Sequence, residues 1–148
     1  MRLSLEVVIL SKTGLHAVRA MVALAKLPAG TYAGAARIAQ DIGAPPNYLS
    51  KLLKALAEKG LVESQKGLGG GFRLARDARQ ITLLDVVEPI EHVRRWSGCI
   101  LGRSECSEVE PCAIHHRWKA VRDAYLRMLE QTTIAQLVAR GEPAPVTR

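Results

Sequence analysis

All three cysteines of the chain lie in one short segment that also holds two adjacent histidines. The segment contains Cys99, Cys106 and Cys112, followed by His115 and His116. Thiolates and imidazoles are the donors that zinc, other soft metals and iron–sulfur clusters prefer. Most residues between the cysteines are polar, whereas buried structural thiols usually have apolar neighbours. We therefore interpret this segment as a metal site. The odd number of cysteines also excludes a complete disulfide framework within one chain.

The spacing alone leaves the metal open. Zinc would accept three cysteines and one histidine in a closed tetrahedral site that holds the fold together. An iron–sulfur cluster would use the same ligands and would respond to oxidants, nitric oxide or iron supply. The fourth donor is also open, because His115 and His116 both follow Cys112 by about one helical turn.

A second set of candidate residues lies on the outer face of a helix that we expect to begin at Pro46 and to end at Gly60. The buried face is defined by leucines at helical spacing, namely Leu49, Leu52, Leu53 and Leu56. The opposite face carries side chains that can meet base edges and phosphates, namely Asn47, Tyr48, Ser50, Lys51 and Lys54. A merely solvated surface would more often mix both signs of charge. This face therefore predicts nucleic-acid recognition.

A glycine-rich hairpin is expected directly after this helix. Residues 61–64 and 72–75 have strand character, and the residues between them are mostly glycine. The glycine-rich tip could approach a phosphate backbone closely, and Lys66 and Arg73 place positive charge at the base of this tip. A dinucleotide-binding loop is excluded, because its glycines must open a helix and strand residues follow here. Helices and hairpin together predict a winged helix-turn-helix.

The elements that position these residues are predicted from helical periodicity. Apolar residues recur over residues 15–27 and 33–42, with Ser11 or Thr13 as the first N-cap and Gly43 as a left-handed C-terminal residue. Another helix is expected to follow Thr82, with Asp85 completing a capping-box-like start. Pro89 should kink this helix or end it early.

The last helix is predicted to run from about residue 112 to 138. Its apolar stripe is too long for this small domain to cover, so we expect a homodimer that places two DNA-binding heads about one DNA turn apart. The stripe contains Trp118, Val121, Tyr125, Met128, Leu129 and Leu137. Residues 139–148 are expected to be disordered. The predicted organisation is thus a DNA-binding domain over residues 11–80, then a cysteine loop and dimerisation helix over residues 81–138.

Composition and charge narrow the class of protein. The chain has 148 residues, of which 48% are apolar, so one folded domain of ordinary size is expected. Residues 1–80 hold 12 Lys or Arg against 5 Asp or Glu, whereas residues 81–148 hold 9 of each kind. The basic excess in the first half favours a polyanionic partner there. A membrane-spanning or secretory segment is not expected, and the predicted location is cytoplasmic.

A resemblance to a known family covers about residues 11–138. The motifs that carry it are SKTGLHAVRAMVALA, APPNYLSKLLKALAEKGLVESQKGLGGGFRLAR and ITLLDVVE. They resemble the Rrf-two family of bacterial winged-helix transcription regulators, and in particular its IscR-like and NsrR-like iron–sulfur sensors. The resemblance implies a mainly α fold with a small β wing, and a homodimer that binds a double-stranded DNA operator. The positions that match the family's DNA contacts are Asn47, Ser50, Lys51 and Lys66.

The resemblance also implies the cofactor. Cysteines in this loop ligate an iron–sulfur cluster in such members, more often [2Fe-2S] than [4Fe-4S], and the IscR-like spacing makes His115 the fourth ligand. The family's other fourth ligand, an aspartate in the partner's first helix, has no counterpart, because Leu15 occupies the matching position. The expected function is a transcription regulator, favoured as a repressor, that senses nitric oxide, redox state or iron–sulfur supply. The alternative is a zinc-stabilised or thiol-switched repressor without a cluster.

An enzyme is not expected. The chain has no C-x-x-C redox pair and no cofactor-binding loop, and it offers no plausible pairing of nucleophile and base outside the cysteine segment.

Overall fold

Three helices build the front of the molecule. A computed structural model of the chain describes residues 10–94, 98–105 and 107–141. The helices are α1 (Lys12–Ala25), α2 (Ala35–Ile42) and α3 (Pro46–Glu58). Ser11 caps α1 by accepting the Gly14 N–H at 3.0 Å, and α2 ends at Gly43 with a left-handed φ of 71°. Pro46 opens α3, where its fixed φ suits the first turn. The predicted helix-turn-helix is confirmed.

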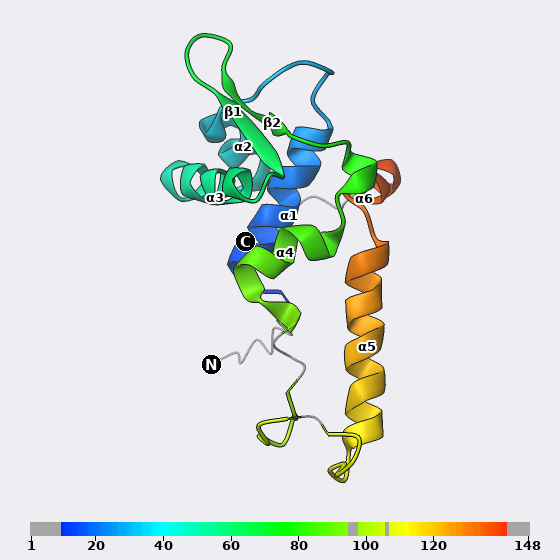
Figure 1. Cartoon of the computed structure of the whole chain (residues 1–148). Helices are drawn as coiled ribbons and strands as arrows, with labels where there is room; N and C mark the ends of the chain where they lie inside the picture. The colour runs from blue at the N-terminus through cyan, green and yellow to red at the C-terminus, as the bar shows by residue number, and fades with distance from the viewer. Residues whose placement is uncertain (1–9, 95–97, 106, 142–148) are drawn as a thin grey trace, which may run out of the picture.

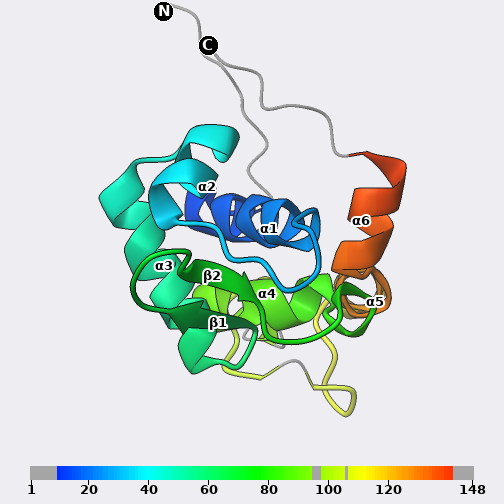
Figure 2. The ribbon, with the colours of Figure 1, turned by 90° about the horizontal axis from the view of Figure 1, so that it is seen from above.

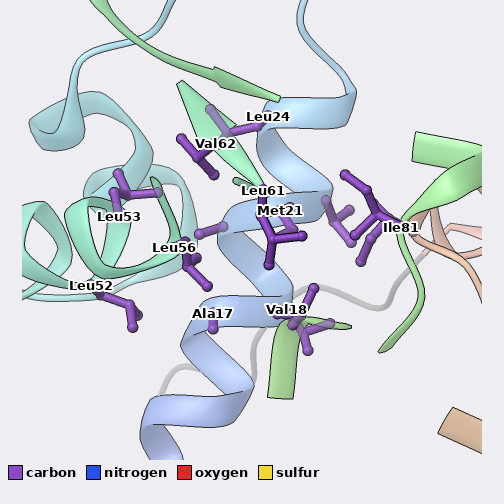
Figure 3. Close-up of a cluster of buried hydrophobic side chains, with 14 of the residues drawn as sticks. Ala17, Val18, Met21, Leu24, Leu52, Leu53, Leu56, Leu61, Val62 and Ile81 are labelled. Atoms are coloured by element: carbon purple, nitrogen blue, oxygen red, sulfur yellow. The ribbon is translucent and has the colours of Figure 1, made fainter. Parts of the chain in front are cut away.

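The core lies where α1 meets α3 and the first strand (Figure 3). Ala17 and Met21 of α1 are fully buried, as are Leu49 and Leu53 of α3. The four leucines predicted to form the inner face of α3 are all buried. Apolar burial of this kind is the main favourable contribution to folding, and it fixes α3 against α1.

The hairpin after α3 consists of β1 (Val62–Gln65) and β2 (Gly71–Leu74), paired antiparallel with Glu63 opposite Arg73. Phe72 and Ala33 exchange two backbone hydrogen bonds, of 2.8 and 2.9 Å, which tie the hairpin to the residues before α2. A Cβ on Gly71 would lie 2.4 Å from the Ala33 carbonyl oxygen. Only glycine fits this close approach of two backbones, so the predicted wing is a fixed part of the fold.

The next helix is α4 (Leu83–Glu91), which follows a short 3-10 turn, η1 (Ala78–Gln80). Thr82 and Asp85 form the predicted capping box. Pro89, expected to kink this helix or to end it early, does not end it at once, because the helix continues to Glu91 and ends at His92 with a φ of 50°. Pro89 lies in the last turn, where the missing N–H costs only one hydrogen bond near the helix end.

The long C-terminal helix is present, but its predicted extent was wrong. The structure has two helices, α5 (His115–Gln131) and α6 (Ile134–Arg140). The break is fixed by pairing with the start of α4, since the Thr132 carbonyl accepts the Leu83 N–H at 2.8 Å and Ile134 donates to Ile81 at 2.9 Å. Thr133 then caps α6 through a capping box. Residues 139 and 140, expected in a disordered tail, complete α6, and residues 142–148 lie outside the described residues.

The hairpin and the cysteine segment lie at opposite ends of the molecule (Figure 1). Helix α5 runs along one side of the molecule between them. In Figure 2, α6 lies on one side of α1, whereas α2, α3 and the hairpin lie together on the other side. No helix within the described ranges is long and apolar enough to cross a membrane.

Candidate functional site

The outer face of α3 presents its predicted side chains to solvent. Asn47, Lys51 and Lys54 are exposed, whereas Tyr48 and Ser50 are half-buried at the edge of the same face. The burial of the leucines on the opposite side sets this orientation. The face therefore offers an amide and two ammonium groups, which can hydrogen-bond base edges and phosphates.

The lysines of this face have no acidic partners within the described ranges. Neither Lys51 nor Lys54 forms an ion pair with a described carboxylate, and the same holds for Lys66 at the hairpin tip. Lys66 is exposed, and the tip beyond it turns through Gly67 and Gly69, both with positive φ. These three cations are available to a polyanion approaching the front of the molecule.

Arg73 differs from these lysines, although the sequence placed it with them. Its guanidinium pairs with Glu63 across the hairpin and lies over the Tyr32 ring at 4.5 Å from the centroid. The hydrogen bond that Arg73 donates to the Glu63 carboxylate raises the pKa of Arg73 above its usual value. Its charge is thus already compensated within the hairpin. The register places Glu63 opposite Arg73, so a register prediction would have revealed the pair.

Tyr48 connects the exposed face to the interior. Its ring meets the edge of His16 of α1, with centroids 5.6 Å apart. His16 is 6% exposed, and burial, followed by the charges of Lys12 and Arg19, lowers the pKa of its imidazole. A neutral imidazole is therefore favoured beside Tyr48. No spacing in the sequence pointed to this contact.

Two of the three cysteines come together at the other end of the molecule. The sulfur atoms of Cys99 and Cys112 are 3.7 Å apart. Two thiolates bound to one tetrahedral metal at about 2.3 Å stand about 3.8 Å apart, so this separation fits a shared metal or cluster iron. Cys106 lies outside the described residues. Within the described ranges, no three metal-ligating side chains converge.

Local hydrogen bonds hold the two cysteines in place. The Cys99 thiol lies among the backbone donors of Arg103 and Leu101, and these lower its pKa, with Cys112 contributing after them. The His115 N–H donates to the Cys112 carbonyl at 3.1 Å, and the Trp118 indole donates to the Gly98 carbonyl at 3.1 Å. A lowered pKa favours the thiolate, which is the form that binds metals.

The two candidate histidines differ in exposure. His115 is 2% exposed at the first position of α5, whereas His116 is exposed. Their rings contact each other edge to face, with centroids 5.1 Å apart. Burial beside the turn that holds Cys112 favours His115 as a ligand, although its role stays a prediction.

Polar contacts complete the cysteine segment. Arg103 donates to the Glu110 carbonyl at 2.8 Å, and Glu108 pairs with Lys119 of α5. The hydrogen bond from Lys119 lowers the pKa of Glu108. The segment is thus attached to the start of α5 by polar groups at its surface.

Comparison with known proteins places the chain among transcription regulators. A family model named Rrf2 and described as "Iron-dependent Transcriptional regulator" matches residues 10–140. The regulator IscR of Cronobacter sakazakii is 30% identical over 138 residues, which cover 93% of this chain and 85% of that protein. The structure of CymR, described as the global cysteine regulator of B. subtilis, superposes with a TM-score of 0.74 at 28% identity, covering 90% of this chain and 98% of that one. IscR of T. potens superposes with a TM-score of 0.72 at 25% identity, covering 94% and 92%.

Proposed function

Because this chain belongs to the Rrf2 (Rrf-two) family of transcriptional regulators, and is therefore a regulator rather than an enzyme, we propose that it binds a DNA operator through α3 and the hairpin. The observation that carries this proposal is the outer face of α3, where Lys51 and Lys54 are exposed and form no ion pair with a described carboxylate. Lys66 of the hairpin is likewise exposed and forms no ion pair with a described carboxylate. Such cations gain affinity by displacing counterions from phosphates.

The contacts divide by chemistry. Asn47, Ser50 and Lys51 at the start of α3 are placed to read base edges, since a recognition helix presents its N-terminal residues to the major groove. Lys54 and Lys66 bind phosphates and set the register of the protein on the duplex. The charge of Arg73 is paired with Glu63, so in this proposal Arg73 stabilises the hairpin and does not contact the DNA.

The regulator acts as a homodimer in this proposal. Val121 and Met128 are 62% and 47% exposed and lie two helical turns apart, on the same side of α5. A second copy that covers this side of α5 would bury them and would place two basic heads on one operator.

An iron–sulfur cluster, favoured as [2Fe-2S], is the proposed sensor. Cys99, Cys106, Cys112 and His115 would hold it, and it would supply chemistry that responds to nitric oxide, redox state or iron–sulfur supply. The sulfur separation of Cys99 and Cys112 and the burial of His115 support these ligands. Because the segment joins α4 to α5, ordering it would change the population of the conformation that spans the operator.

The alternative is a repressor that contains zinc, or that switches by its thiols, without a cluster. The 3.7 Å between Cys99 and Cys112 supports it as well, since a peroxide could take two electrons and two protons from these thiols, leaving water and, after a small movement, a disulfide between the two sulfurs. The structural likeness to CymR fits this alternative equally.

Mobility shifts with promoter DNA from the protein's own locus test the regulatory proposal. A complex that survives excess non-specific competitor, and that weakens steeply with salt, is expected. Absence of a specific complex with both the metal-loaded and the metal-free protein would contradict it.

Metal analysis after anaerobic isolation separates the two sensors. A cluster predicts a brown protein that absorbs visible light and contains iron and acid-labile sulfide. A colourless protein with stoichiometric zinc would favour the zinc form, and one without metal would favour the thiol switch.

A further inference from the structure

The carboxylate of Glu91 holds the start of α1. Its Oε1 accepts two hydrogen bonds from Ser11, one from the backbone N–H at 2.6 Å and one from the hydroxyl at 2.7 Å. The same hydroxyl accepts the Gly14 N–H and so caps the helix. A negative charge at this end is favourable, because the first turn of a helix exposes unpaired N–H groups and the positive end of its dipole.

Gly14 makes room for this carboxylate. A Cβ at this position would lie 2.1 Å from Glu91 Oε1, closer than non-bonded atoms can approach. Glycine inside a helix is otherwise unfavourable relative to alanine. The carboxylate is thus seated against the helix backbone, and a single methyl group would displace it.

Glu91 lies at the end of the helix that precedes the cysteine segment. It is the last residue of α4, and the helix ends at His92, which has a left-handed φ of 50°. Helix α4 packs against α5, the helix on the far side of the segment, and burial first and the charge of Glu91 second raise the pKa of the Tyr125 hydroxyl of α5. A shift of the end of α4 would therefore move the Glu91 carboxylate away from Ser11.

A short path leads from the start of α1 to the recognition helix. His16 follows the Ser11 cap by five residues, is buried, and touches the Tyr48 ring of α3. Tyr48 lies between Asn47 and Ser50, which we propose to read bases. A displaced first turn of α1 would therefore change the support under the first turn of α3.

We infer that Glu91 is a positioning residue that transmits the state of the cysteine segment to the recognition helix through the N-terminus of α1. This inference rests on the proposed function, because it assigns the route by which the sensor would act on the DNA-binding face. It requires that loss of the carboxylate contact with α1 change the stability of α3.

Amide hydrogen exchange of the full-length protein tests this route without DNA. The variants are Glu91→Ala and the matched control Glu88→Ala. The control removes a carboxylate from the same helix, one that accepts the Arg94 N–H at 3.2 Å and has no other hydrogen-bond partner among the described residues. Residues 49–56 of α3 should exchange about 2- to 30-fold faster in Glu91→Ala, the range of effects seen for mutations between coupled sites, and should be unchanged in Glu88→Ala. Faster exchange confined to α1, or equal acceleration of every slow amide, would overturn the inference.

A substitution at Gly14 gives a second test, in which the expected change in thermal stability has opposite signs in two backgrounds. Gly14→Ala should lower thermal stability in the wild type, although alanine normally favours a helix, because the methyl group displaces the carboxylate. In the Glu91→Ala background the same substitution should raise stability. A rise in both backgrounds would show that the carboxylate contact is not a constraint, and would overturn the inference.

Operator affinity distinguishes this inference from the proposed function. Glu91→Ala should weaken specific binding about fivefold, whereas Glu88→Ala should stay within about twofold, and Glu91→Gln, which keeps an acceptor oxygen, should recover part of the loss. Equal losses in Glu91→Ala and Glu88→Ala would count against Glu91. Failure of the wild type to bind DNA specifically would refute the proposed function, while the exchange and stability results would still decide the role of Glu91.

Discussion

The DNA-binding head and the cysteine segment are held together in different ways. In the head, large side chains from α1, α3 and the hairpin bury one another, and Met21 and Leu53 are fully inaccessible. In the cysteine segment, Ile100, Leu101 and Val109 are 53%, 62% and 91% exposed, and the contacts are hydrogen bonds and a surface ion pair. The head therefore has a shape fixed by apolar packing, whereas polar contacts at the surface hold the described part of the segment. Under the proposed function, this difference would suit a rigid DNA-binding head controlled by a more easily deformed sensor.

The largest expected effect comes from removing a core side chain of the head. Leu53→Ala should lower the free energy of unfolding by about 2–5 kcal/mol, because it deletes buried methyl groups and leaves a cavity. Val109→Ala in the cysteine segment should change it by less than about 0.5 kcal/mol. Urea unfolding of the metal-free protein measures both. Similar losses in the two variants would remove the contrast between the regions.

The next effect concerns the surface of the head. Lys51→Ala should cost about 1–3 kcal/mol of specific operator binding, because it removes a side chain placed to read a base edge. Lys66→Ala should weaken binding to all sequences and reduce the salt slope by about 1. Competition titrations at several salt concentrations separate the two effects. Equal, sequence-independent losses would contradict a base-reading role for Lys51.

A smaller effect is expected where the C-terminal helices join the head. Thr133→Ala removes the cap of α6, whose hydroxyl accepts the Gln136 N–H at 3.3 Å, and should cost about 1 kcal/mol of stability. Ala at the exposed Gln131, just before the break, is the control. If Thr133→Ala were neutral, the junction would be held by its backbone pairing alone.

The smallest effect is a pH dependence at the surface of the head. Arg79 donates hydrogen bonds to Asp77 and lowers the pKa of this carboxyl from 3.8 to about 2. Because the folded-state pKa is the lower one, the contribution to stability is present above pH 3.8 and is lost as the pH falls through about 2. Asp77→Asn should therefore differ from the wild type at neutral pH and approach it near pH 2. A difference that does not change with pH would contradict this origin.

Much of the head could be predicted from sequence, because local rules and apolar periodicity agree there. Leu49 and Leu53 repeat at helical spacing. Just beyond the head, Thr82 with Asp85 is likewise a capping box that residue types alone predict. The break after Gln131 was missed because backbone pairing with the start of α4 fixes it, although Thr133 and Gln136 form a second readable capping box.

The candidate site was predictable in composition but not in geometry. Residue types alone indicated a metal site at Cys99 and Cys112, yet only the fold shows that their sulfurs lie 3.7 Å apart. The sequence predicts that Arg73 contacts DNA, whereas the hairpin register places it opposite Glu63, with which it forms an ion pair. Glu91 and Ser11 are 80 positions apart in the chain, so no local sequence pattern predicts their contact.

The most direct test of the account compares operator affinity in two states of one anaerobic preparation. The wild type is isolated with its cofactor, its iron, sulfide and visible spectrum are measured, and operator DNA is titrated before and after the cofactor is removed. The account predicts a coloured protein with iron and sulfide, and an operator Kd that changes by about tenfold, or about 1.4 kcal/mol, on removal. A protein that contains iron and sulfide but binds the operator equally well in both states would contradict it, as would a colourless protein without iron.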